Sequence, residues 1–139
     1  MDFIKWDESF SVGVKLIDAQ HQKLFKMINT LHNSLKKIDN GGSEPLENII
    51  LQLAAYVDFH FNTEEKYFHE FDYEKTKEHE AQHKFYEDKI KEFNDKYQKG
   101  AVEDEMGVEI LKFLEEWIMK HIKVNDKEYT KCFNEHGLA

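Results

Sequence analysis

Apolar residues recur at three- and four-residue spacing along most of the chain, which is the period of an amphipathic α-helix. The first such stripe predicts a helix over residues 19–38, with apolar positions at Leu24, Met27, Ile28, Leu31 and Leu35. Further stripes predict helices over 44–69, 74–99 and 102–123, followed by a short C-terminal segment over 126–134. Strand-like alternation is confined to the beginning of the chain, so residues 1–17 are expected to form an extended N-terminal arm.

Residues that break regular structure are few, and they lie between these stripes. The Asn40-Gly41-Gly42 stretch with Pro45 predicts one loop, Gly100 predicts another, and Asp18 is a candidate N-cap for the first helix. Four long helices with short connections predict an all-α fold, an antiparallel up-down-up-down four-helix bundle, in a single domain over 1–139. The residues of the third helix expected to face its core are Phe85, Tyr86, Ile90 and Phe93.

The composition is acidic and contains no arginine. All 19 basic residues are lysine, 28 residues are acidic, and the formal net charge is -9. This charge disfavours nucleic acid and anionic membranes as partners, and bidentate recognition of phosphates lacks its usual side chain. No stretch approaches the roughly 18 apolar residues of a membrane span, the chain starts without an apolar signal core, and the single Cys132 cannot form an internal disulfide. A cytoplasmic protein without membrane insertion is therefore expected.

Histidines and two acidic residues gather near the ends of the predicted helices. His60 and Glu64 lie four residues apart near the end of the second helix, and His79 and His83 lie four apart near the start of the third. Residues at this spacing share a helix face, and in an antiparallel bundle the starts of helices one and three lie beside the ends of helices two and four. The groups expected to meet at one end of the core are His21, His60, Glu64, His79, His83, His121 and Asp126.

The spacing between His121 and Asp126 does not fit a regular helix. Five residues rotate the second side chain by roughly 140° from the first, because a helix has about 3.6 residues per turn. The fourth helix is therefore expected to break, or to widen by a π-type bulge, between these two residues.

A metal would remove the cost of burying these polar side chains without partners. Any one H-x-x-x-E match can arise by chance, and the histidines outside the set, His32, His69 and His136, are interpreted as surface or structural residues. Five imidazoles and two carboxylates exceed the four positions of a structural zinc ion, so two ions are predicted. With both carboxylates and one solvent-derived oxygen as bridges, an ion with three imidazoles has six ligands, and an ion with two keeps an open position. Iron suits these donors among redox metals, while manganese, copper and zinc remain alternatives.

Five segments, spread over nearly the whole chain, form a recognisable set. They are Trp6 with Val12-Gly13-Val14, Asp18-Ala19-Gln20-His21, His60-Phe61-Asn62-Thr63-Glu64-Glu65, His79-Glu80-Ala81-Gln82-His83, and Trp117-Ile118-Met119-Lys120-His121 followed by Asp126. Together they resemble the hemerythrin family, in the form of its stand-alone bacterial members. The resemblance implies two non-haem iron ions with an oxo or hydroxo bridge. By the same resemblance one iron is held by His79, His83 and His121, the other by His21 and His60, and both are bridged by Glu64 and Asp126.

The resemblance also implies reversible binding of dioxygen at the iron with two histidines, for oxygen storage, transport or delivery, without enzymatic activity. An apolar pocket should protect the open position from water; its candidate walls, one turn from ligands, are Leu24, Phe25, Trp117 and Ile118. Ordinary core packing is the main role expected of each of these residues, and the two roles are compatible. Tyr56 and Tyr67 are open alternatives, either as hydrogen-bond donors to a ligand carboxylate or as packing residues.

Two other classes of function remain as alternatives. The first is oxygen or redox sensing, or iron handling, through a separate partner protein, because 139 residues leave no room for a second domain. The second is a di-iron oxidase or peroxidase. Ferritin-like di-iron enzymes favour carboxylates and carry two Glu-x-x-His motifs, whereas this chain has one such match and more imidazoles than acids, which favours release of dioxygen over its cleavage.

Overall fold

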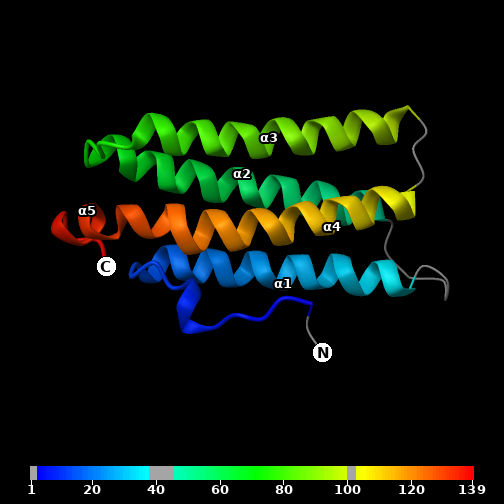
Figure 1. Cartoon of the computed structure of the whole chain (residues 1–139), viewed down its shortest axis with the longest axis horizontal. Helices are drawn as coiled ribbons and strands as arrows, with labels where there is room; N and C mark the ends of the chain where they lie inside the picture. Colours follow the sequence, from blue (N-terminus) through cyan, green and yellow to red (C-terminus); the bar gives the residue numbers. More distant parts are fainter. Residues whose placement is uncertain (1–2, 38–45, 100–102) are drawn as a thin grey trace.

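The computed structural model describes residues 3–37, 46–99 and 103–139, which form a bundle of four long helices (Figure 1). Helix α1 spans Lys15–Lys37, α2 spans Leu46–Glu70, α3 spans Thr76–Gln98 and α4 spans Glu103–Lys120. A π-helical turn at His121–Asn125, a 3-10 turn at Asp126–Tyr129 and the short helix α5 at Thr130–Glu135 follow α4. Helix α1 contacts α2 and α4, and α3 contacts the same two helices. The predicted all-α antiparallel bundle is confirmed.

The first helix begins earlier than its pattern predicts, at Lys15 rather than at residue 19. Ile17 is fully buried and extends the apolar stripe by about two turns from Leu24 toward the N-terminus. Asp18 is therefore not the N-cap but lies in the first turn of α1, where a negative charge suits the helix dipole. Its carboxylate accepts hydrogen bonds from the Ser11 hydroxyl at 2.6 Å and the Val12 backbone N–H at 2.8 Å, so it ties the arm to α1.

The N-terminal arm contains a short 3-10 turn at Glu8–Phe10, so it is not extended throughout as its alternation predicts. The Asn29 side chain accepts from the Ile4 N–H at 2.9 Å and donates to the Ile4 carbonyl at 2.8 Å. The Thr130 hydroxyl donates to the carbonyl of Val12. These contacts hold the arm against α1 and the C-terminal segment, beside the end of the bundle where α4 gives way to the π-helical turn (Figure 1).

One of the four core-facing predictions for the third helix is wrong. Tyr86 and Phe93 are buried and Ile90 is partly buried, but Phe85 is 61% exposed. Neighbouring helical residues point about 100° apart, so Phe85 cannot share the inward direction of Tyr86. Phe85 instead lines a surface groove between α3 and α4.

The turn between α2 and α3 is five residues long, over 71–75, with Asp72 in the left-handed conformation at a φ of 51°. The predicted loops at residues 40–45 and at Gly100, and the predicted helix starts at residues 44 and 102, lie outside the described residues. Within the described part, no helix combines the length and the hydropathy needed to cross a bilayer.

Candidate metal centre

The structure brings all seven predicted site side chains together at one end of the core, where each is at most 3% exposed. Helix α1 supplies His21, α2 supplies His60 and Glu64, α3 supplies His79 and His83, and the turns after α4 supply His121 and Asp126. Their donor atoms form two clusters in which every atom lies within 4.8 Å of the others. One cluster is Glu64, His79, His83 and His121, and the other is His21, His60, Glu64 and Asp126.

Glu64 belongs to both clusters. Its Oε1 lies 3.2 Å from the Nε2 of His60 and 3.2 Å from the Nε2 of His83. The Nε2 of His60 in turn lies 2.9 Å from that of His21. This carboxylate therefore lies between the imidazoles of α1 and α2 and those of α3 and α4.

Asp126 occupies a matching position. Its Oδ1 lies 2.8 Å from the Nε2 of His79 and 3.0 Å from the Nε2 of His121, while its Oδ2 lies 3.3 Å from the Nε2 of His21. Each of the two carboxylates thus contacts imidazoles of both clusters, which is the position that a bridging ligand between two ions requires.

The π-helical turn explains how His121 and Asp126 share one face. In this turn the backbone N–H of Asp126 donates to the carbonyl of His121, five residues earlier. The widened turn accommodates the extra residue that a regular helix would rotate away from the core. Of the two expected alternatives, a break or a π-type bulge, the structure has the bulge, and such bulges are frequent at functional sites.

Several of the converging atoms are fully buried without a hydrogen-bond partner in the described part of the chain. They are the Nε2 atoms of His79, His83 and His121, Oε1 of Glu64, and both carboxylate oxygens of Asp126. The contacts between them are short but lack hydrogen-bonding geometry. Each orphaned polar group costs about 1–3 kcal/mol, and cations placed among imidazole nitrogens and carboxylate oxygens would remove this cost. The donor set therefore fits transition-metal ions.

The pKa values of the site keep the carboxylates charged. Burial, and for Glu64 also the charge of Asp126, would raise both carboxyl pKa values, but the neighbouring imidazoles hold both well below their ordinary range. Burial lowers the pKa of His60. Burial would also lower the pKa of His83, but the carboxylates of Glu64 and Glu65 outweigh it and raise that pKa to about 9. In the metal-free chain, His83 is therefore protonated at neutral pH.

Gln20 orients one of the imidazoles. Its Oε1 accepts a hydrogen bond from the Nδ1 of His60 at 2.7 Å, which leaves the Nε2 of that ring free to face the centre. The Tyr56 hydroxyl donates to the backbone carbonyl of Gln20 at 3.1 Å and not to a carboxylate. This role of Gln20 was not predicted from the sequence, although a polar residue directly before His21 on a buried helix face was a usable signal.

Tyr129 is the hydrogen-bond donor to a central carboxylate. Its fully buried hydroxyl lies 2.6 Å from Oε2 of Glu64. Burial, together with the charges of Glu64 and Asp126, raises the pKa of this phenol well above its ordinary value, so it stays protonated and donates. The two tyrosines considered from the sequence do not have this role, and Tyr67 packs on the ring of Phe71 instead.

Replacing Tyr129 by phenylalanine is expected to destabilise the metal-free protein by about 1–3 kcal/mol, because Glu64 would lose its donor in a site sealed from water. Urea unfolding of the chelator-treated protein measures the loss. The matched control is Tyr67→Phe, which removes a hydroxyl from a partly buried ring and should stay within about 0.5 kcal/mol of the parent. Equal losses in the two variants would contradict a specific role for the Tyr129 hydroxyl.

The four candidate walls of an oxygen pocket lie in different surroundings. Leu24 and Ile118 are fully buried. Phe25 packs edge-on against Trp6 and Phe10 of the arm, at ring-centroid distances of 5.4 Å and 4.8 Å. Trp117 stacks on His121 at 4.3 Å and lines the groove between α3 and α4. Their assignment to a pocket stays a prediction.

The histidines expected to lie outside the centre do so. His32 stacks on Phe3, and His136 stacks on Phe71. His69 forms an exposed pair with Glu80, with its Nε2 at 2.8 Å from the carboxylate.

Comparison with known proteins agrees with this architecture. Residues 12–132 match the family model described as the hemerythrin HHE cation binding domain. A bacteriohemerythrin from Clostridium acetobutylicum is 33% identical over 127 residues, which cover 89% of this chain and 96% of the relative. A hemerythrin-like protein from Naegleria gruberi is 28% identical over 129 residues, covering 89% of this chain and 88% of the relative. A crystal structure of wild-type hemerythrin superposes with a TM-score of 0.80 at 25% identity, over 94% of this chain and 97% of that one.

Proposed function

The chain belongs to the hemerythrin family, and from this premise we propose that its centre holds two non-haem iron ions and binds dioxygen reversibly. The observation that carries the proposal is the convergence of five imidazoles and two carboxylates in a buried site. When bound, the iron pair would supply the electrons that dioxygen accepts on binding and returns on release. The similarity to relatives shows the family, and the donor atoms of this chain support the proposal that it binds metal ions.

We assign one iron to three imidazoles and the other to two. The cluster of His79, His83 and His121 supports the first assignment, and the pair of His21 and His60 supports the second. Glu64 and Asp126 are proposed as the bridges, because each contacts imidazoles of both clusters. The iron with fewer protein ligands would then hold the open position for dioxygen.

The chain's own residues would orient the ligands and exclude water. Tyr129 holds Glu64 by a hydrogen bond, and Gln20 holds the ring of His60. Leu24 and Ile118 are retained as proposed walls, since both are fully buried and each lies one turn from a ligand. A dry, apolar shell of this kind would slow autoxidation by withholding protons from the bound oxygen.

We propose a binding role in storage, transport or delivery of dioxygen, and not an enzymatic one. Neutral imidazoles outnumber anionic carboxylates at the centre, which stabilises ferrous iron and favours release of dioxygen over cleavage. The cytoplasmic location stays a prediction from the sequence.

Iron analysis combined with absorption spectroscopy tests this proposal. After anaerobic loading with ferrous iron, the protein is expected to contain two iron ions per chain. Dioxygen should then produce a charge-transfer band that disappears under argon and returns on re-oxygenation. One ion or none per chain, or oxidation without recovery in the first cycle, would overturn the proposal. Continuous consumption of dioxygen with a reductant would instead indicate an oxidase.

The affinity for ferrous iron is expected to fall as the pH decreases. Burial would lower the pKa of His83, but the carboxylates of Glu64 and Glu65 outweigh burial and raise this pKa to about 9. Below that pH, a proton must therefore leave the His83 ring when iron binds. The apparent affinity should therefore fall about tenfold per pH unit from this proton alone.

A competition titration against a metal-binding dye, from about pH 9 to pH 6, measures this slope. His60 should contribute to it only at lower pH, because burial lowers its pKa. An affinity that does not change across the whole range would contradict the role of His83 as an iron ligand.

A further inference from the structure

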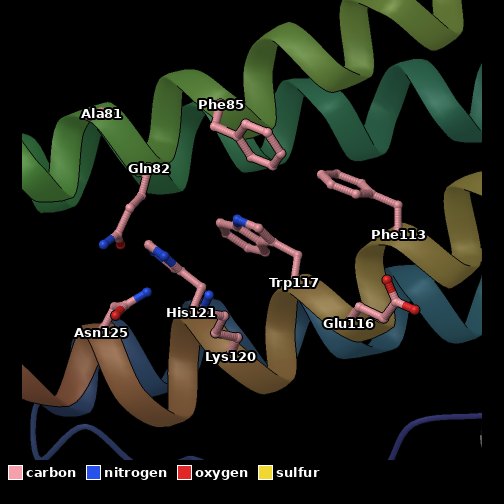
Figure 2. A pocket seen from close by; sticks show the side chains of 9 residues that line it. All are labelled: Ala81, Gln82, Phe85, Phe113, Glu116, Trp117, Lys120, His121 and Asn125. Carbon is pink, nitrogen blue, oxygen red and sulfur yellow. The ribbon is translucent and has the colours of Figure 1, made fainter.

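A groove between α3 and α4 extends from the surface to one imidazole of the metal centre (Figure 2). Its volume is about 560 Å³, which lies within the range of small-molecule sites in proteins. The lining residues that matter here are Phe85, Phe113 and Trp117, which are aromatic, and Gln82, His121 and Asn125, which are polar. No step of the proposed dioxygen binding uses this groove.

The outer part of the groove is aromatic. The rings of Phe85 and Phe113 come from opposite helices, with their centroids 6.3 Å apart. Phe85 is 61% exposed and lies on α3, whose surface is otherwise rich in charged residues. Large exposed apolar side chains at a hollow mark a binding site more often than scattered ones do. This part of the groove fits a flat, apolar ring.

Two stacked rings connect the groove to the metal centre. The Trp117 ring lies parallel to the His121 ring, at a centroid distance of 4.3 Å and an interplanar angle of 13°. The Nε2 of His121 lies 3.0 Å from Oδ1 of Asp126, within the set of metal donors. A ring bound against Trp117 would therefore be separated from the proposed iron by two aromatic side chains in contact.

The inner end of the groove carries polar atoms that need partners. Nδ1 of His121 and Oε1 of Gln82 are buried without a hydrogen-bond partner in the described part of the chain. Figure 2 shows the side chains of Gln82 and Asn125 pointing toward His121 at this end. The two carboxamides provide donors and acceptors for the polar edge of a ring, after small rotations of their side chains.

The charges of the groove and of the whole chain favour an uncharged ligand. At the rim, Lys120 and Glu116 offset each other. The chain as a whole has a net charge of -9, so it repels phosphorylated ligands. A neutral planar ring with carbonyl groups along one edge matches the aromatic walls, the polar inner end and the charge together.

We propose that this groove binds a neutral redox-active ring of the flavin or quinone class and admits electrons to the metal centre through Trp117 and His121. The binding part rests on the groove alone, and the electron transfer rests on the proposed function. In the reaction, the reduced ring loses two electrons and two protons. The two electrons convert two ferric ions to ferrous ions, the protons pass to solvent, and the oxidised ring leaves. Electron transfer at this site would thus return autoxidised, ferric protein to the ferrous state.

Binding is tested on the metal-free chain, so that its outcome does not depend on iron or dioxygen. Titration with riboflavin is expected to give saturable quenching of flavin fluorescence by Trp117. Phe85→Glu, which places a charge on the aromatic wall, should weaken binding at least tenfold. Phe59→Glu is the matched control, because Phe59 is 56% exposed on α2 and outside the groove; it should bind like the parent.

Competition by an uncharged naphthoquinone tests which of the two ligand classes, quinone or flavin, the groove accepts. Displacement of riboflavin supports the quinone class, and riboflavin binding without displacement supports the flavin class. Binding of neither probe, or equal weakening by the two variants, would overturn the proposed site.

Electron transfer is tested with the iron-loaded, ferric protein. Dihydroriboflavin should reduce Phe85→Glu about tenfold more slowly than it reduces the parent and Phe59→Glu. Dithionite, a small anion that needs no aromatic site, should reduce all three at similar rates. Equal rates with dihydroriboflavin in all three proteins would overturn the electron-entry role, even where riboflavin binds.

Discussion

Removing the metal ions from the loaded protein is expected to lower its thermal midpoint by about 10–15 °C. Metal that binds the folded chain stabilises it by about 4 kcal/mol when its free concentration is about 1,000 times the dissociation constant. For a domain of this length, 1 kcal/mol corresponds to about 3 °C in the midpoint. Calorimetry of the iron-loaded and chelator-treated proteins measures the difference.

The expected direction follows from the buried donors. Without ions, the unpaired atoms of His79, His121 and Asp126 remain in the core, where water does not reach them. Adding chelator to protein that is already metal-free should leave the midpoint unchanged, and reloading with iron should restore it. A loss below about 3 °C, or one that reloading fails to reverse, would contradict the coupling of metal binding to folding.

The sequence predicts the bundle from helical periodicity, and it predicts the cluster of candidate ligands from that periodicity together with the antiparallel order of the four helices. Spacings of four residues place His60 with Glu64, and His79 with His83, on common helix faces. The misfit between His121 and Asp126 predicts either a break or a π-type bulge, because no regular helix brings both inward, and the structure has the bulge. In each case the geometry of a single helix determines the result.

Contacts between distant segments were not predictable in the same way. Tyr129 is 65 residues away from Glu64 in sequence, and Gln20 is 40 residues away from His60. Which of several tyrosines reaches a carboxylate depends on how the helices pack. Asp18 illustrates the same limit. Its sequence position predicts an N-cap, but its hydrogen-bond partners are Ser11 and Val12 of the arm, and their positions depend on how the arm packs against α1.

Asp126→Asn is expected to reduce the iron content from two ions per chain to one or none. Asparagine keeps the shape of the side chain but removes the negative charge, and its amide N–H groups repel a cation. Substituting the outer partners of metal ligands already costs about 10–100-fold in affinity, so loss of a bridging ligand should cost more than 100-fold. Iron analysis after anaerobic loading and desalting measures the occupancy.

Glu128→Gln is the matched control, because this residue lies in the same 3-10 turn and undergoes the same chemical change. Its carboxylate is exposed and pairs with the Lys75 ammonium at 2.6 Å, away from the centre. The control should keep both ions. If Asp126→Asn also kept both, Asp126 would not be a bridging ligand, and its buried carboxylate would serve only to pair with the imidazoles. Loss of both ions in Asp126→Asn would instead mean that neither cluster holds an ion alone, since Asp126 contacts His79 and His121 in one cluster and His21 in the other.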